Sequence, residues 1–388
     1  MHEYKINLAE NTISQDELVC LADWIKSGAR LTKGELTKKF EKEFAAYIGV
    51  QHAVFVNSGS SANLLMLYAL MESGQLRNRK AIIPAVSWIT TLSPFIQFGF
   101  EPHLCEADKR TLGMDVDHFE DLCKKFQPAV AIVVHVLGHA CEMEAISSIC
   151  QKYDVVLLED ACEALGTTYN GKKLGSLGAA GSFSFYYGHH ISTIEGGMVT
   201  TSDNQLYNTM LSIRSHGWSR DVESVYQEKW KQEFDVDEVR EYYTFYYPGF
   251  NLRSTDLNAF VGISQLARVD QITRQREMNF WLYKKRLADK FYCQNSTSDN
   301  LSSFAYGTMV ENRVDVHRHL LKHGIETRPL ICGSMAKQPF WVKKYGAISF
   351  ENADLIHDYG IYLPNHLALD DTKINHICDK FLEIAQPV

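Results

Sequence analysis

The stretch GSFSFYYGHHISTIEGG, residues 181–197, joins an apolar, aromatic run to two adjacent histidines and a pair of glycines. The aromatic run has the composition of a buried strand, and the polar break after it marks the end of that strand. Small residues beside such a break let a backbone approach a ligand closely. His189 and His190 each offer an imidazole that can act as a general base near neutral pH. Because adjacent residues of an extended segment point to opposite sides, we expect only one histidine to face the ligand.

Apolar strands alternate with amphipathic helices on both sides of this stretch. The predicted strands include HAVFV (52–56), AIIPA (81–85), AVAIVVHV (129–136) and VVLLED (155–160). Such alternation predicts an α/β fold with a mostly parallel central sheet covered by helices on both faces. Ligands of these sheets bind at the carboxyl ends of the strands.

The chain after this sheet predicts a second, smaller domain. One long amphipathic helix is expected over about 254–290, followed by a C-terminal α/β region. The sequence therefore predicts a large N-terminal domain over residues 1–265 and a connecting helix with a small domain over residues 266–388.

Three features at the predicted strand ends have both a functional and a structural interpretation. In NSGSSANLL, the backbone N–H groups of Gly59 and Ser60 at a helix start can hold an anion, or the turn is only a helix cap. Asp160 closes an apolar strand, where a buried carboxylate needs a partner, but it can also cap the next segment. Trp88 can stack on a planar ligand or fill the core. These residues indicate a binding site and leave its ligand open.

Six motifs in order resemble the fold-type-I, vitamin-B6-dependent sugar aminotransferases and dehydratases. They are NSGSSAN, PAVSW, LLEDACEALG, SFSFYYGHHISTIEGG, HGW and GFNLRSTDLNA, and the resemblance covers about residues 10–380. Members of that family place a lysine seven residues before the first glycine of EGG, where it forms a Schiff base with pyridoxal 5′-phosphate (PLP). His189 stands at that position here, and the nearby Lys172 and Lys173 lie in the turn-like NGKKLG. An imidazole cannot form the Schiff base, and the family branch with histidine here comprises the 3-dehydratases of deoxysugar biosynthesis.

The resemblance also implies roles for other residues of these motifs. Asp160 is expected to bind the pyridine nitrogen of PLP, Trp88 to cover its ring and Glu163 to lie near its hydroxyl group. The phosphate ligands are expected to be Gly59, Ser60 and Ser184. Family members are dimers with active sites at the subunit interface, and Asn251 is expected to reach the phosphate in the partner subunit.

Four further residues are predicted to bind the substrate. Arg253 follows Asn251 and can meet a carboxylate or phosphate from the same side. Arg328, before a proline, is a candidate anion ligand, although a solvated salt bridge is the common role of a surface arginine. The set is His216, Arg220, Arg253 and Arg328.

The family branch implies a specific reaction. Glutamate is expected to convert PLP to pyridoxamine 5′-phosphate, and His189 is expected to be the base that assists loss of the C3 hydroxyl from a nucleotide-linked 4-keto-6-deoxysugar. The expected substrate is GDP-4-keto-6-deoxy-D-mannose, in the biosynthesis of a 3,6-dideoxysugar of the colitose type for O-antigen lipopolysaccharide.

Three alternatives to this function have less support in the sequence. The missing lysine disfavours an ordinary nucleotide-sugar aminotransferase. An iron–sulfur-dependent 3-dehydratase is disfavoured because no cysteine lies between Cys162 and Cys293, where the cluster ligands would be. A non-catalytic relative with a binding or regulatory role is disfavoured because Asp160, Trp88 and the phosphate turn are retained.

Composition and charge limit the classes of partner that the protein is expected to bind. The chain has 388 residues, 45% of them hydrophobic and 22% charged, which is ordinary for a globular protein. The formal net charge of −8 disfavours nucleic acid and anionic membranes as partners. Nine scattered cysteines without a CxxC pair indicate reduced thiols and no metal site. The start MHEYKINLAENT lacks signal-peptide features, and no stretch is long enough to span a bilayer, so a cytoplasmic protein is expected.

Residues 221–246 are charged and aromatic without clean periodicity. They are expected to form an excursion at a subunit interface or over the active site.

Overall fold

A seven-stranded sheet forms the centre of the chain in the computed structural model, which describes residues 5–388. The strand order is β1-β9-β8-β5-β4-β2-β3. Strand β9 runs antiparallel to both of its neighbours, and the other neighbouring pairs are parallel. The predicted mostly parallel sheet is therefore confirmed. The strands are β1 (His52–Val56), β2 (Lys80–Pro84), β3 (Glu101–Cys105), β4 (Val130–Val134), β5 (Val156–Asp160), β8 (Ala180–Ser184) and β9 (Gly197–Thr201).

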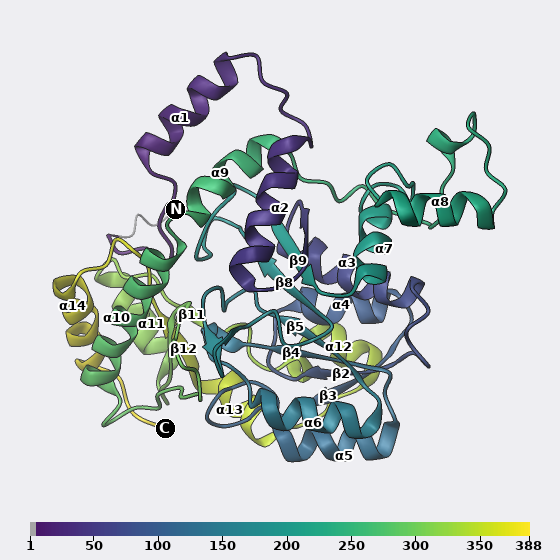
Figure 1. Ribbon diagram of the computed structural model, residues 1–388. Coiled ribbons are helices and arrows are strands. Elements are labelled where there is room, and N and C mark those ends of the chain that lie inside the picture. The colour runs from purple at the N-terminus through teal and green to yellow at the C-terminus, as the bar shows by residue number, and fades with distance from the viewer. Residues whose placement is uncertain (1–4) are drawn as a thin grey trace.

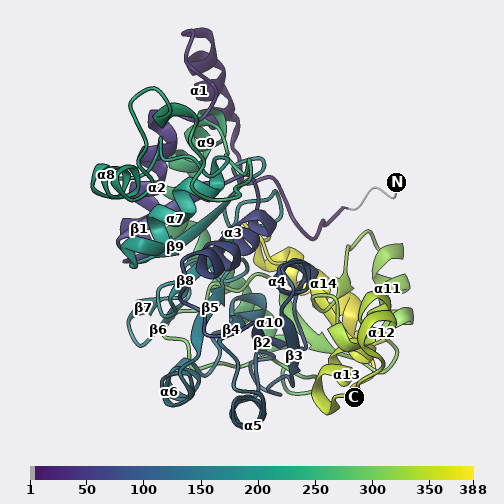
Figure 2. The same ribbon diagram turned by 90° about the vertical axis from the view of Figure 1, so that its right-hand side faces the viewer.

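Helices cover both faces of this sheet (Figures 1 and 2). Alternate residues of β1 show why, since Val54 and Val56 belong to one buried apolar cluster, whereas Ala53 and Phe55 belong to another. A strand that is apolar on both faces needs a helical layer on each side. The helices around the sheet are α2 (Glu35–Ile48), α3 (Gly59–Glu72), α4 (Ile89–Gln97), α5 (Val116–Phe126), α6 (Met143–Tyr153), α7 (Asn204–Arg214) and α9 (Asp256–Leu266).

A three-stranded antiparallel sheet follows in the C-terminal part of the chain, in the order β10-β12-β11. It packs with a third buried apolar cluster that includes Phe280, Leu320 and Phe381. Other C-terminal residues, such as Trp341 and Ile356, pack into the core of the large sheet. The division at 265/266 stays a prediction. The elements are α10 (Val269–Leu287), β10 (Tyr306–Met309), α11 (Arg313–Lys322), β11 (Arg328–Pro329), α12 (Pro339–Tyr345), α13 (Glu351–Tyr359), β12 (Gly360–Leu363) and α14 (Asp371–Leu382).

Short elements complete the chain: the hairpin of β6 (Thr168–Tyr169) and β7 (Lys172–Lys173), and the 3₁₀ turns Val136–Gly138, Glu241–Tyr243 and Met335–Lys337.

Two segments project from the body. Helix α1 (Gln15–Lys26) begins with a capping box, in which Ser14 accepts a hydrogen bond from the Glu17 backbone and the Glu17 side chain accepts one from the Ser14 backbone. The predicted excursion 221–246 carries α8 (Ser224–Glu233) and extends outward at the opposite side of the view in Figure 1.

Two local predictions are wrong. The single helix over 254–290 is broken between α9 and α10, where Arg268 has non-helical backbone angles (φ −110°, ψ 3°). Its side chain donates to the Thr12 carbonyl at 2.8 Å and pairs with Glu17 at 3.0 Å. The histidine segment is not extended either, because strand β8 ends at Ser184 and the His189 N–H closes a turn onto the Tyr186 carbonyl at 2.9 Å.

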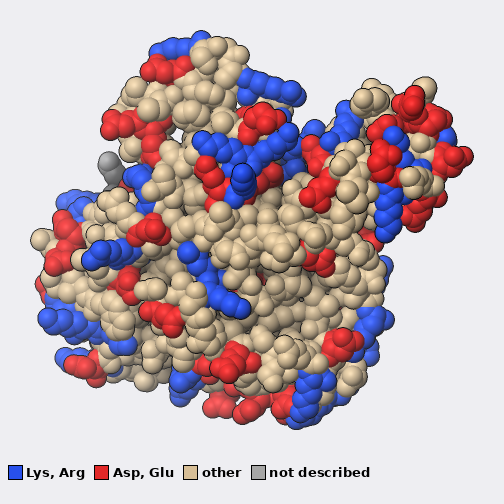
Figure 3. Space-filling model, viewed as in Figure 1, with Lys and Arg blue, Asp and Glu red and all other residues tan. Residues whose placement is uncertain are grey.

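None of the helices in residues 5–388 combines the length and the apolarity needed to cross a membrane. Acidic and basic side chains are interspersed over the face shown in Figure 3, and the projecting arm with α8 bears both signs.

Candidate functional site

A cavity of about 810 Å³ opens at the carboxyl ends of the central strands. The strand register explains its position, because Asp160 at the end of β5 pairs with Val134 of β4 and with Ser182 of β8. Eight of the predicted site residues line it: Gly59, Ser60, Trp88, Asp160, Glu163, Ser184, His189 and Arg328. The residues Asn7, Leu8 and Ala9, near the N-terminus, lie against its wall.

Asp160 is a buried carboxylate whose hydrogen bonds come from neutral groups. Its Oδ2 accepts from Asn63 Nδ2 at 2.8 Å and from Thr91 Oγ1 at 2.7 Å, and its Oδ1 accepts from the Cys162 N–H at 3.2 Å. No cationic side chain of residues 5–388 forms an ion pair with it. A buried anion without a counter-ion is costly, so the donor set fits a ligand that brings a positive charge, such as a protonated pyridine nitrogen.

The start of α3 forms a cradle for an anion. Ser58 caps the helix by accepting a hydrogen bond from the Ser61 N–H at 3.0 Å. Gly59 lies so close to Ser184 that a Cβ added to the glycine would stand 2.5 Å from the serine Cβ. Backbone N–H groups at a helix start, together with nearby hydroxyl groups, suit a phosphate. Ser60 extends this polar surface, and its hydroxyl group lies 3.1 Å from that of Thr90.

His189 lies on the turn between β8 and β9 and is only partly buried. Its Nδ1 lies 2.8 Å from the carbonyl oxygen of Cys162, so Nδ1 carries the hydrogen and Nε2 keeps its lone pair. No hydrogen bond to Nε2 is formed by the described residues. Burial lowers the pKa of this imidazole to about 4. The charge of Arg276 also lowers the pKa, whereas the hydrogen bond to Cys162 raises it. The ring is therefore neutral near pH 7 and available as a base.

Arg276, on α10, is a buried cation behind His189 that sequence reasoning missed. Its guanidinium donates to the carbonyls of Phe304 at 2.9 Å and Asn365 at 2.6 Å, and more weakly to that of His189 at 3.4 Å. Burial lowers the pKa of Arg276 to about 10, so the side chain remains charged near neutral pH. The Phe304 ring lies 5.2 Å from the His189 ring, centroid to centroid, and lines the cavity.

The remaining predicted residues on the cavity wall differ in exposure. Glu163 accepts from the Leu137 N–H at 2.9 Å, and burial raises its pKa to about 7. Trp88 is 54% exposed, so its ring is free to cover a ligand. Arg328 is exposed on β11.

Two other histidines near these strand ends do not reach the cavity. The buried His190 has Nε2 3.0 Å from the Ser302 carbonyl, and burial holds its pKa well below the usual value. His135 is buried against Glu159, with Nε2 and Oε2 3.1 Å apart. His189 is therefore the histidine that the structure presents to a ligand.

Four predicted residues lie outside the cavity and form a second cluster. The Arg253 Nε donates to Asn251 Oδ1 at 3.0 Å, and its Nη2 lies 3.4 Å from His216 Nε2. Arg220 stacks on Trp218 with its guanidinium carbon 3.9 Å from the ring centroid. Within this one chain, the second cluster is therefore separate from the cavity; it consists of Asn251, His216, Arg220 and Arg253. The roles predicted for these residues stay predictions.

Lysines are absent from the part of the cavity wall that residues 5–388 provide. Lys172 and Lys173 lie on the β6–β7 hairpin, where the Lys173 ammonium sits 4.4 Å from the centre of the Tyr47 ring.

Besides Arg276, which lies behind the cavity wall, several residues of the wall itself were not predicted. Asn63 has a sequence signal, since it lies one turn into the helix after the NSGS turn, and Ser182 fixes its amide by donating to Oδ1 at 2.6 Å. Thr91 has a similar sequence signal, since it lies three residues after the end of the PAVSW motif. Other contributors include Cys162, Tyr186, Tyr187, Glu195, Phe304, Glu326 and Tyr362.

Similar proteins of known structure share this architecture. An Escherichia coli GDP-4-keto-6-deoxy-D-mannose-3-dehydratase with bound hydrated PLP superimposes with a TM-score of 0.89 at 30% identity, covering 98% of this chain and all of that one. A GDP-4-keto-6-deoxymannose-3-dehydratase with a trapped PLP-glutamate geminal diamine gives a TM-score of 0.88 at 29% identity, covering 97% of this chain and 100% of that chain.

Sequence similarity extends over nearly the whole chain. The GDP-4-keto-6-deoxy-D-mannose 3-dehydratase of Yersinia pseudotuberculosis is 33% identical over 381 residues, which cover 94% of this chain and 96% of that protein. The model of the DegT/DnrJ/EryC1/StrS aminotransferase family matches residues 11–382. This chain belongs to the DegT/DnrJ/EryC1/StrS aminotransferase family.

Proposed function

We propose that this protein is a PLP- and glutamate-dependent 3-dehydratase that removes the C3 hydroxyl group of GDP-4-keto-6-deoxy-D-mannose. The observation that carries the proposal is His189, which stands at the family's lysine position and lines a cavity to which residues 5–388 contribute no lysine; none of these residues bonds to its Nε2. The solved and curated dehydratases that the chain resembles act on this substrate by name. Family membership alone would fit an aminotransferase equally well.

The cavity residues suit PLP held without a covalent bond to the protein. Asp160 offers an anionic partner for the pyridine nitrogen, and the Gly59–Ser184 cradle offers donors for the phosphate. Trp88 would cover one face of the ring, and Glu163 would lie toward its hydroxyl group. When bound, PLP would supply the electron sink for exchange of the glutamate amino group and for departure of the C3 hydroxyl group of a 4-ketosugar.

His189 supplies the proton transfers. Its neutral Nε2 would take a proton from the bound ligand, and the resulting imidazolium would give a proton to the departing hydroxyl group. The Cys162 carbonyl keeps Nδ1 protonated throughout, so only Nε2 exchanges protons with the ligand. In the net reaction the sugar loses one oxygen atom, while glutamate becomes 2-oxoglutarate and its nitrogen leaves as ammonia.

A lysine at this position would work against that outcome. Its amine would compete for the cofactor and return the protein to transamination, whereas an imidazole leaves the cofactor free to complete the elimination. This argument disfavours the aminotransferase alternative. The non-catalytic alternative is disfavoured because Asp160 remains buried without a cation in the described chain.

The working form that we propose is a homodimer with shared active sites. In this arrangement Asn251 reaches the partner's PLP phosphate, and His216, Arg220 and Arg253 bind the nucleotide pyrophosphate there. Exposed apolar residues on the projecting segments, Leu18 and Val19 on α1 and Tyr243 and Phe245 on the arm, support an interface. Arg328 would bind substrate from the same chain as His189. The nine cysteines are all unpaired, which supports a cytoplasmic location.

The test is a complete reaction with purified protein, PLP, excess glutamate and GDP-4-keto-6-deoxymannose. The expected result is ammonia in equal amount to 2-oxoglutarate and a sugar product lighter by one oxygen atom. An amino sugar without ammonia would overturn the proposal in favour of transamination. Formation of 2-oxoglutarate without sugar turnover would keep the half-reaction and reject the GDP-sugar as substrate.

A further inference from the structure

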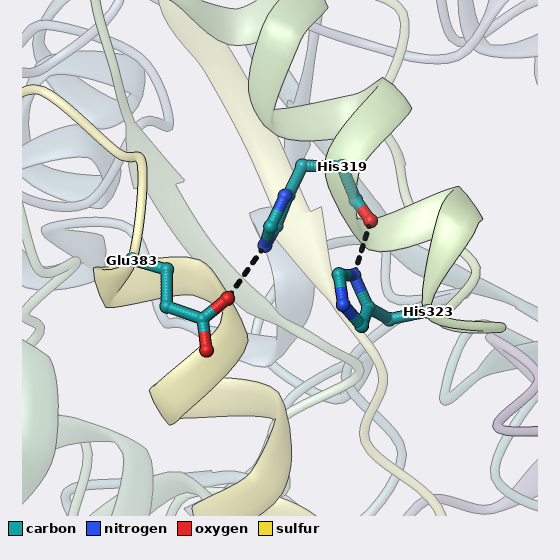
Figure 4. Close-up of side chains that lie close together, drawn as sticks. All are labelled: His319, His323 and Glu383. Carbon is teal, nitrogen blue, oxygen red and sulfur yellow. Dashed lines mark hydrogen bonds and ion pairs between the residues drawn. The ribbon is translucent and has the colours of Figure 1, made fainter.

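A cluster of three metal-ligand side chains lies outside the cavity, at the ends of α11 and α14 (Figure 4). His319 and His323 come from the end of α11, and Glu383 follows α14. One ligand atom from each lies within 4.8 Å of the others. Among residues 5–388, this is the one group of three or more such side chains that meets at this distance.

The two histidines have the spacing that metal ligands need, and His323 also has the tautomer; a metal ion would replace the hydrogen that His319 Nε2 shares with Glu383. Residues four apart lie on one face of a helix, and a His-x-x-x-His pair is a recurrent zinc-binding arrangement. His323 Nδ1 donates to the His319 carbonyl at 2.8 Å, which leaves its Nε2 with a free lone pair. His319 Nε2 lies 3.0 Å from Glu383 Oε2, so the imidazole and the carboxylate already point toward each other.

The electrostatics of this place favour a cation. His323 and Glu383 are the C-cap residues of α11 and α14, and helix C-termini carry partial negative charge. The carboxylate of Glu383 adds to that charge. The cationic partners that face it are Lys380, with Nζ bonded to Oε1 at 2.6 Å, and His319 when protonated. A divalent ion would neutralise both helix ends and the carboxylate together.

We propose that His319, His323 and Glu383 bind a zinc-class divalent cation. Two imidazole nitrogens and one carboxylate oxygen make a three-ligand set, with a water molecule at the fourth position. Zinc–ligand distances of about 2.0–2.2 Å require a modest inward rotation of these side chains, two of which are partly exposed and one exposed. The ion would fasten α11 to the final helix, α14. Since none of the three lines the cavity, its role is structural.

Calorimetric titration of zinc chloride into chelator-treated, tag-free holoenzyme tests the site. The parent protein is expected to bind one zinc ion per chain. His323→Ala and His319→Ala are each expected to weaken binding by more than about tenfold, because each removes a direct ligand. Glu383→Gln is expected to weaken binding while preserving a hydrogen-bond acceptor for His319. The matched control is His376→Ala, an exposed histidine on α14 outside the cluster, which is expected to bind like the parent.

Thermal unfolding supplies a second measurement. Zinc is expected to raise the Tm of the parent and of His376→Ala and to leave that of His323→Ala unchanged. Equal zinc affinity in the parent and in all three cluster variants would overturn the proposal, because the ion would then bind elsewhere. Absence of binding heat up to about 1 mM zinc, a range that corresponds to only about 4 kcal/mol of affinity, would overturn it as well.

Discussion

The Nδ1 atom of His189 lies 2.8 Å from the carbonyl oxygen of Cys162, two residues after the buried Asp160. This contact connects the turn after β8 with the segment after β5, so the orientation of the base depends on the strand end that carries Asp160. A carbonyl accepts only, and Nε2 is therefore the nitrogen left for chemistry. The same strand end is thus expected to position both the electron sink and the base.

Replacing His189 by asparagine is expected to lower the dehydration rate by roughly 10²–10⁴-fold, which is the usual contribution of a positioned base. The measurement is product formation with saturating glutamate, together with Tm and PLP retention to establish folding. His376→Asn is the matched control, since it lies on α14 outside the cavity. Dehydration at the parent rate in His189→Asn would reject this residue as the base.

Arg276 is expected to shift the acidic limb of the pH–rate profile toward lower pH. The neutral imidazole of His189 is the active form and is present above its pKa of about 4. Burial is the main cause of the low pKa, and the Arg276 charge lowers it further. Arg276→Met removes that charge, so the pKa rises and the acidic limb moves to higher pH.

Arg276→Lys is the control for that shift because it keeps the charge while changing the hydrogen bonds. The measurement is kcat from pH 4 to 8. The acidic limb of the Arg276→Lys profile is expected to stay close to that of the parent. A methionine variant with an unmoved limb and a normal Tm would show that Arg276 acts only through structure.

Asp160→Asn is expected to weaken PLP binding by roughly 100-fold or more, because breaking a buried charge pair costs about 3–5 kcal/mol. Equilibrium dialysis with absorbance of the bound cofactor measures this effect. Asp154→Asn, at a carboxylate that is 90% exposed, serves as the control. Unchanged PLP affinity in Asp160→Asn would remove this residue from the cofactor site.

Subunit mixing tests the proposed composite site. His189→Asn and Arg253→Ala are each expected to be inactive, but an equal mixture after subunit exchange should recover about a quarter of parent activity. After exchange, half of the dimers contain one subunit of each variant. In each of these mixed dimers one of the two sites combines an intact His189 with an intact Arg253, which gives a quarter of all sites. No recovery, with exchange verified by native mass spectrometry, would mean that His189 and Arg253 serve the same chain's site.

The sheet could be predicted from the sequence because its strands are apolar on both faces, as Val54 and Phe55 illustrate. The cavity position followed from the rule that ligands bind at the carboxyl ends of such strands. The register to the EGG motif predicts His189 as the site histidine, and the structure places this residue on the cavity wall, but the supporting argument from an extended backbone is wrong. The turn onto Tyr186 depends on a local hydrogen bond that residue types do not reveal.

The missed features depend on contacts between distant parts of the chain. The break before α10 involves Arg268 bonding to Thr12 and Glu17, more than 250 residues away. In the sequence, Arg276 has the pattern of a surface residue of an amphipathic helix. Its partners are backbone carbonyls, and since every residue has one, the sequence does not indicate which of them the arginine binds. Only the assembled fold identifies either arginine as buried or bridging.

The shared guanidinium of Arg276 has a mechanical consequence. One side chain of the connecting helix is bonded to Phe304 and Asn365, which flank the small sheet, and to the backbone of His189. A rotation of the small sheet about α10 would therefore pull on the loop that holds the base. Any closing movement over the sugar would change the distance between base and substrate, so that the position of the small sheet and the reactivity of the site would vary together.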